Sequence, residues 1–152
     1  MKKLPALFQD LHHVCIVVRD IEASTSYYES IGVGPWQQMT SFEAFREELQ
    51  VPDIEAFMQL KYRYALLNNI QIQLCEPPDG NTLQRRFLEQ YGEGVFHLGF
   101  TVADCDTAEE LGEAVGLEVL MRGRKPDRSG FTYFHTAEGG AGVTLEIRAA
   151  SK

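Results

Sequence analysis

Two histidines and two residues with side-chain oxygens occupy matching places in the sequence, and together they are candidate metal ligands. His13 and His97 each lie near the start of a short apolar stretch, and Gln73 and Glu146 each lie within a later one. Imidazole nitrogens and amide or carboxylate oxygens bind divalent cations such as Zn, Co, Ni, Mn or Fe. Four protein ligands would leave two octahedral positions open for water or substrate.

An internal repeat accounts for this match. The segments HHVCIVVRDIEASTSYYESIGV and FHLGFTVADCDTAEELGEAVGL align without a gap, so that His13 meets His97 and Asp20 meets Asp104. Each segment begins with a short apolar run typical of a strand. An acidic residue that can cap a helix follows, then a helical segment, and a glycine suited to a left-handed helix end.

Each copy continues into further predicted strands. The first half contains LKYRYALL and IQIQLCE around a turn at Asn68–Asn69, and the second contains EVLMRGR, FTYFHTA and VTLEIRA. We therefore predict an α+β fold in one domain, 1–152, made of two βαβββ modules at about 11–80 and 94–149. A helix at about 82–91 joins them. An insert at 41–59 is predicted to be helical and partly closed by Pro52.

The alternation of side chains along the strands brings the candidate ligands to one face. In IQIQL and VTLEI the apolar residues point one way and Gln73 and Glu146 the other. We expect the apolar faces to pack on the helices, and His13, Gln73, His97 and Glu146 to meet in a cleft between the halves. By the same alternation His12 lies on the face opposite His13 and is structural. His135, near a strand end, is expected at the surface.

Composition excludes several classes of protein. Hydrophobic residues make up 44% of the 152 residues, which suffices for a packed core. The net charge of -8 and the lack of a basic cluster argue against nucleic-acid binding. The apolar runs are shorter than the roughly 20 residues of a membrane span. Three cysteines without a CxxC pair favour neither disulfides nor a thiolate zinc site, so we expect a cytoplasmic protein.

The chain resembles the vicinal oxygen chelate superfamily, which includes glyoxalase I, methylmalonyl-CoA epimerase, extradiol dioxygenases and fosfomycin or bleomycin resistance proteins. The resemblance covers about residues 11–149 and is closest to the methylmalonyl-CoA epimerase-like branch, through HHVCIVVRDIEASTSYYE and IQIQLCEPPDGNTLQRRFLEQYGEGVFHLGFTV. It implies curved, paired βαβββ sheets around a metal whose ligands are His13, Gln73, His97 and Glu146. Because such proteins are often dimers, it also implies a possible homodimer.

The predicted reaction follows from the site. A divalent metal that binds two neighbouring substrate oxygens makes an adjacent C–H more acidic, and Glu146 is the predicted base. The resemblance favours an epimerase or isomerase of an acyl thioester. The epimerases carry a second acid–base Glu, and the best alignment puts Gln59 at that position. Four carboxylates of the insert could reach the cleft instead: Glu43, Glu47, Glu48 and Glu55.

Two other functions stay open for this small-molecule site. One is a glyoxalase I-like lactoylglutathione lyase, which, like the epimerase, would need cations to recognise its thiol cofactor. Candidates for that role are Arg63, Arg85, Arg86, Arg122, Arg124 and Lys125. The other is a drug-binding resistance protein without catalysis, in which aromatic residues hold a planar ligand. Candidates are Trp36, Phe42, Phe45 and Phe57. A complete ligand set favours the enzyme, although fold alone does not decide function.

Overall fold

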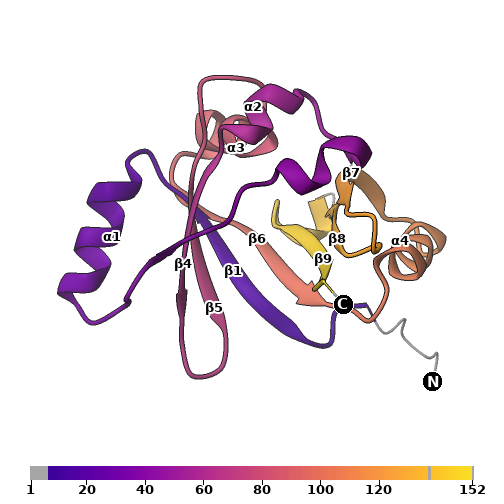
Figure 1. The fold of residues 1–152 in the computed structure, drawn as a ribbon, viewed down its shortest axis with the longest axis horizontal. Coiled ribbons are helices and arrows are strands. Elements are labelled where there is room, and N and C mark those ends of the chain that lie inside the picture. Colours follow the sequence, from indigo (N-terminus) through magenta and orange to yellow (C-terminus); the bar gives the residue numbers. More distant parts are fainter. Residues whose placement is uncertain (1–6, 137, 152) are drawn as a thin grey trace.

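A computed structural model describes residues 7–136 and 138–151. Its strands form a single nine-stranded mixed sheet in the order β2-β4-β5-β1-β6-β9-β8-β7-β3, with helices packed around it (Figure 1). None of the helices in these two ranges combines the length and apolar character that a membrane crossing requires.

The elements follow the predicted repeat closely. The first half comprises β1 (Leu11–Val17), α1 (Ile21–Ser30), β2 (Gln37–Gln38), β4 (Lys61–Leu66) and β5 (Gln71–Glu76). The second half comprises β6 (Gly94–Thr101), α4 (Cys105–Ala114), β7 (Glu118–Arg124), β8 (Gly130–His135) and β9 (Thr144–Ala149). The connecting helix is α3 (Leu83–Tyr91), as predicted. The α+β prediction is confirmed.

The two halves are arranged symmetrically about the centre of the sheet. β1 and β6 pair antiparallel at the centre, and each pairs on its other side with the last strand of its own half, in parallel. Outward from the centre the order is therefore β1-β5-β4-β2 on one side and β6-β9-β8-β7 on the other. The repeated sequence thus places β1 and β6, which carry the two histidines, side by side.

The helix ends repeat as well. The Asp20 side chain accepts a hydrogen bond from the backbone N–H of Ala23 at the start of α1, and Asp104 caps α4 in the same way. Beyond the two helices, Gly32 and Gly116 each have a φ of +94°, a conformation that L side chains rarely adopt. The predicted caps and helix ends are confirmed.

The insert is less helical than predicted. It contains a 3₁₀ turn, η1 (Glu43–Glu48), a two-residue strand, β3 (Leu49–Gln50), and one short helix, α2 (Ile54–Met58). β3 pairs with β7 at the far edge of the sheet, and Leu49 is buried in the core. Pairing with an open sheet edge and burial of Leu49 favour an extended backbone here over a helix. The insert therefore runs from the first half across to the second.

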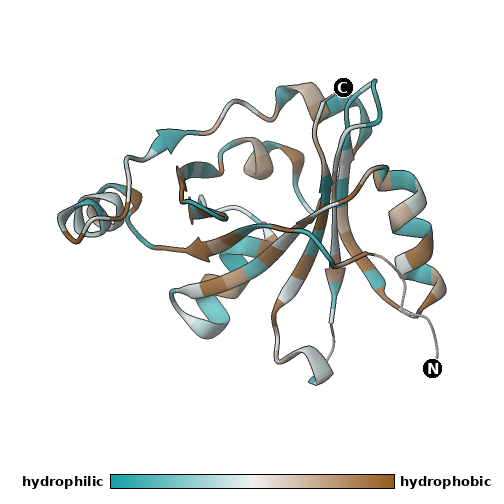
Figure 2. Ribbon diagram, turned by 90° about the horizontal axis from the view of Figure 1, so that it is seen from below, coloured by the Kyte–Doolittle hydropathy of each residue, from teal (hydrophilic) through white to brown (hydrophobic). Residues whose placement is uncertain are grey.

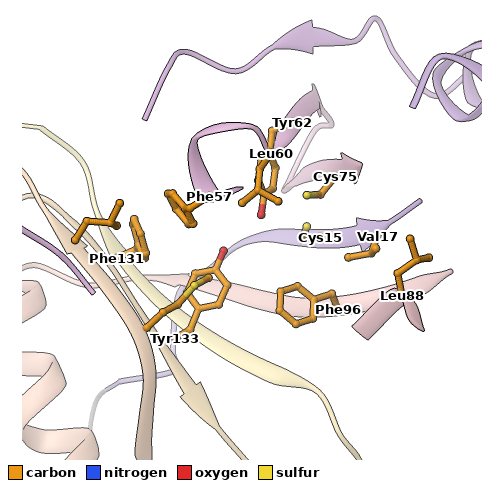
Figure 3. Close-up of a cluster of buried hydrophobic side chains, with 12 residues drawn as sticks. Cys15, Val17, Phe57, Leu60, Tyr62, Cys75, Leu88, Phe96, Phe131 and Tyr133 are labelled. Carbon is orange, nitrogen blue, oxygen red and sulfur yellow. The ribbon is translucent and has the colours of Figure 1, made fainter. Parts of the chain in front are cut away.

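The largest apolar cluster lies on the same side of the sheet as the candidate ligands. Cys15 and Val17 share one face of β1 with His13 and pack there with aromatic residues such as Phe57, Tyr62 and Tyr133 (Figure 3). Hydrophobic positions are distributed along both halves of the sheet (Figure 2). The face that carries the ligands is therefore also largely apolar, in addition to the opposite face, which was expected to pack on the helices. The helices α1 and α4 do cover that opposite face, with smaller clusters.

Candidate metal centre

Three side-chain atoms converge on one point between the two halves. Nε2 of His13 lies 2.9 Å from Nε2 of His97 and 3.0 Å from Oε2 of Glu146, and Nε2 of His97 lies 2.8 Å from the same oxygen. The three residues are buried, with exposed fractions of 2%, 0% and 7%. In the described residues they form a group that could hold a metal ion.

The sheet register brings these side chains together. Gln71, His13, Gly99 and Glu146 are directly paired in a row across β5, β1, β6 and β9. His97 lies two residues before Gly99 on the same face of β6. Ligands far apart in the sequence therefore become neighbours because the four central strands are hydrogen-bonded in this order.

Gly99 leaves the space that the imidazole of His13 occupies. A Cβ atom built on residue 99 would lie 2.1 Å from Cε1 and 2.3 Å from Nε2 of His13. No side chain other than hydrogen fits at this distance. The absence of a side chain lets His13 reach across β6 towards His97 and Glu146.

Two β-bulges adjust the histidine strands, and sequence reasoning missed both. One extra residue on β1, His12, interrupts the pairing just before His13, and one on β6, Phe96, interrupts it just before His97. A bulge disturbs the alternation of side chains locally. His12 therefore points towards His13, with their Nδ1 atoms 2.8 Å apart, so its predicted placement on the opposite face was wrong. The bulges occupy equivalent positions of the repeat.

The triangle of donor atoms fits a divalent cation. Two neighbouring octahedral ligands, each about 2.1 Å from a metal, lie about 3.0 Å apart, whereas tetrahedral ligands lie about 3.4 Å apart. The observed edges of 2.8 to 3.0 Å match the octahedral value. A single proton can bridge the two Nε2 atoms, but a cation satisfies all three atoms at once. His12 can accept a hydrogen bond from Nδ1 of His13, which leaves the Nε2 lone pair for the metal.

The protonation states of the site residues favour metal binding. Burial lowers the pKa of His97, which keeps its imidazole neutral, the form that binds metal. Burial acts to raise the pKa of Glu146, but His13 and His97 outweigh it and hold that pKa below its usual value. Burial, followed by the neighbouring Arg148 guanidinium, lowers the pKa of His12 to about 4. The site therefore presents a neutral imidazole at His97 and an ionised carboxylate at Glu146 near neutral pH.

A cavity of about 410 Å³ opens beside this triangle and is lined by His13, Gln73 and Glu146. The amide Nε2 of Gln73 donates a hydrogen bond to the side chain of Gln71, at 2.7 Å. That bond turns one end of the amide towards Gln71. The predicted fourth ligand thus lies in the same cavity, and its bond to the metal stays a prediction.

The second acid–base residue that the sequence allowed for is not in this cavity. Gln59 follows α2 as its C-cap and is exposed, and among the described residues Glu146 is the one carboxylate that lines the cavity. The four carboxylates of the insert lie elsewhere: Glu43 and Glu55 pair with Arg46, Glu48 pairs with Arg122 and Arg128, and Glu47 is exposed.

Two tyrosines stand close to the site instead. Tyr62 and Tyr133 line the cavity, and burial raises the pKa of both phenols well above the usual value. Both phenols therefore stay neutral and can donate a hydrogen bond. Tyr64, which pairs with Gln73 across β4 and β5, also lines the cavity and donates a hydrogen bond to Gln37.

The remaining lining matches the sequence predictions in part. Phe42, Phe45 and Phe57 line the cavity, whereas Trp36 packs with α1 on the other side of the sheet. Of the six cations predicted for cofactor recognition, only Lys125 lines this cavity. A second cation there, Arg148, was missed. Its position two residues after Glu146 on the same strand face could have revealed it. His135 is exposed, as predicted.

Comparison with family models identifies one match. Residues 12–134 match the model of the Glyoxalase/Bleomycin resistance protein/Dioxygenase superfamily. This range contains His13, Gln73 and His97 and ends before β9 and Glu146. No protein of curated function matches the chain in sequence.

Several solved structures share the fold at low sequence identity. Methylmalonyl-CoA epimerase from Mycobacterium tuberculosis is 20% identical with a TM-score of 0.73, over 99% of this chain and 94% of that one. A variant of the Streptomyces coelicolor epimerase in complex with 2-nitronate-propionyl-CoA is 21% identical with a TM-score of 0.73, over 97% of this chain and 100% of that one. A methylmalonyl-CoA epimerase in complex with methylmalonyl-CoA and ammonium is 21% identical with a TM-score of 0.72, over 96% of each chain. At this identity the likeness establishes the fold.

Proposed function

The chain belongs to the Glyoxalase/Bleomycin resistance protein/Dioxygenase superfamily, and from this membership and its buried His-His-Glu triangle we propose that it is a divalent-metal-dependent enzyme. Its proposed ligands are His13, Gln73, His97 and Glu146. Its proposed reaction is proton transfer next to a carbonyl, as an epimerase or isomerase of an acyl thioester. The observation that carries the proposal is the convergence of Nε2, Nε2 and Oε2 beside a cavity large enough for a small molecule.

The chemistry divides between the metal and the chain. When bound, a divalent ion would act as a Lewis acid on two neighbouring substrate oxygens and acidify the adjacent C–H. Glu146 is the proposed base, since it is the one carboxylate among the described lining residues. The apolar wall that includes Phe42 and Phe57 limits water around the reacting carbon.

Among the described residues no second carboxylate lines the cavity, and this affects the stereochemistry of the proposed reaction. Full epimerisation needs a proton donor on the face opposite the base. In this cavity that donor would be a hydroxyl group such as that of Tyr64, because Glu146 is already assigned to one face. A weak donor slows return of the proton from the opposite face. The protein would then exchange the α-proton faster than it inverts the carbon.

The test separates proton removal from inversion. The purified protein is first analysed for metal content, as isolated and after loading with Co(II) and removal of the excess. The Co(II) form is then incubated with methylmalonyl-CoA in D₂O, and both α-deuterium incorporation and the ratio of epimers are followed. About one ion per chain together with α-deuteration supports the proposal. An absence of bound metal or of deuteration rejects it.

A lyase of the glyoxalase I type shares the step of proton removal beside a carbonyl. The thiol hemiacetal of methylglyoxal and glutathione therefore serves as the second substrate in the same assay. Turnover of this compound without deuteration of methylmalonyl-CoA would assign the lyase reaction. If no metal binds, the aromatic lining of Phe42, Phe45 and Phe57 favours a non-catalytic small-molecule-binding function.

A further inference from the structure

Arg148 is a cation in the cavity that no described carboxylate neutralises. It lines the cavity on β9, and within residues 7–136 and 138–151 it forms no ion pair. Six other arginines do pair with carboxylates: Arg46, Arg63, Arg85, Arg122, Arg124 and Arg128. The chain has 22 acidic and 14 basic residues, so partners for a cation are plentiful. A half-buried arginine facing a cavity without a partner is therefore unusual here.

A second cation lines the same cavity. Nζ of Lys125 lies 3.3 Å from Oγ of Ser151 and 5.3 Å from the ring centroid of Phe45. These neutral contacts hold the ammonium group without neutralising its charge. With one carboxylate already between two imidazoles, Arg148 and Lys125 leave the open part of the cavity positively charged.

The position of Arg148 limits how far from the metal site an anionic group bound by it could lie. Arg148 is two residues from Glu146 on the same face of β9, and such residues lie about 6.5–7 Å apart along a strand. An anionic group bound by Arg148 would therefore belong to the same small molecule that reaches the metal. An anionic group at the far end of a long substrate would instead be expected to bind farther from Glu146.

We propose that Arg148, with Lys125 beside the same cavity, binds a carboxylate of the substrate that is separate from the two oxygens on the metal. The planar guanidinium presents two parallel N–H donors, which suit a carboxylate. The substrate class is then a carbonyl compound with an additional carboxylate a few bonds away. This inference deepens the proposed function and rests on it for the place of the metal.

The experiment compares three stable 2-hydroxy acids. Lactate offers two vicinal oxygens and no further anion, malate adds a carboxylate, and 3-phosphoglycerate adds a phosphate. Their dissociation constants are measured by calorimetry on the Co(II)-loaded and the metal-free protein. We expect malate to bind the Co(II) form at least about tenfold more tightly than lactate, the range for a charge-assisted hydrogen bond.

Variants assign that preference to the arginine. Arg148→Gln should reduce the ratio of malate to lactate affinity to near one, and Arg148→Lys should restore part of it. Arg86→Gln removes the same charge from an exposed position on α3 and should leave the ratio unchanged. Thermal unfolding of each variant verifies that it is folded, and the wild-type ratio tests the proposal even where a variant is not.

Each outcome has a distinct meaning. Equal affinity for lactate and malate, or a ratio that persists in a folded Arg148→Gln variant, would overturn the carboxylate subsite while leaving the metal site in place. A preference for 3-phosphoglycerate over malate would overturn the assignment to a carboxylate in favour of a phosphate. Equal affinity for malate with and without Co(II), together with a preference for malate over lactate, would support the subsite but contradict the metal's role. Failure of all three acids to bind either form would reject both.

Discussion

The imidazole of His13 lies directly over Gly99, so close that a Cβ on residue 99 would be 2.1 Å from Cε1 of the ring. The two residues pair across β1 and β6, and the imidazole of His13 extends over Gly99 to reach the other ligands. The candidate metal centre therefore depends on a residue that contributes no donor atom.

Gly99→Ala should displace the His13 ring and weaken Co(II) binding at least about tenfold. The overlap also strains the fold, by about 1–3 kcal/mol. Co(II) titration and chemical denaturation measure the two effects. Gly139→Ala is the matched control, because a Cβ there meets no atom within 4 Å. Unchanged Co(II) affinity in a folded Gly99→Ala variant would contradict the placement of His13.

His12→Phe should lower the affinity for Co(II) about 10–100-fold, the range for loss of a hydrogen bond that orients a metal-binding histidine. The expected cause is the contact of 2.8 Å between the Nδ1 atoms of His12 and His13, which phenylalanine cannot make. His135→Phe, at an exposed position, should leave the affinity unchanged. If both variants bind Co(II) as the wild type does, His12 has no role in orienting His13.

Glu146→Gln should keep a folded protein that binds Co(II) at saturating concentration but lose α-proton exchange, by at least about 100-fold. A glutamine can offer an oxygen to the metal, but it cannot take a proton at neutral pH. Deuterium incorporation into methylmalonyl-CoA, measured with Co(II) in excess, separates the two roles. Glu89→Gln, on the exposed side of α3, is the control. Undiminished exchange in the Glu146 variant would remove it as the base.

Asp106 should stabilise the fold in a pH-dependent way. Hydrogen bonds from Arg128, and then from Arg124, lower its pKa to about 2. Because the folded pKa lies below the unfolded value of about 3.9, this stabilisation is present above pH 4 and is lost as the pH falls towards 2.

Asp106→Asn should therefore lower the free energy of unfolding at pH 7, by on the order of 1–2 kcal/mol, since water screens a carboxylate that is 35% exposed. The difference from the wild type should shrink as denaturation is repeated from pH 4 down to pH 2. Asp79→Asn, whose side chain is fully exposed, should show no such difference. A deficit that stays constant over this pH range would argue for a cause other than charge.

Repetition in the sequence was enough to predict the fold and three residues of the candidate centre. The alignment of His13 with His97 and of Asp20 with Asp104 depends only on local patterns: a short apolar strand, a capping carboxylate and a glycine after the helix. The period-two alternation of side chains in β9 places Glu146 opposite the apolar face. Such features act over a few residues, so a single sequence displays them.

The details within the cavity depend on tertiary contacts. Bulges at His12 and Phe96 arise from the pairing of β1 with β6, which no pattern within one strand reveals. The extended backbone of β3 depends on an open edge of β7 more than 70 residues away, and the exposed position of Gln59 depends on where the insert crosses the sheet. That Arg148 forms no ion pair with any described carboxylate likewise follows from which side chains the fold brings near it. These properties result from contacts between distant segments, and only the tertiary structure decides them.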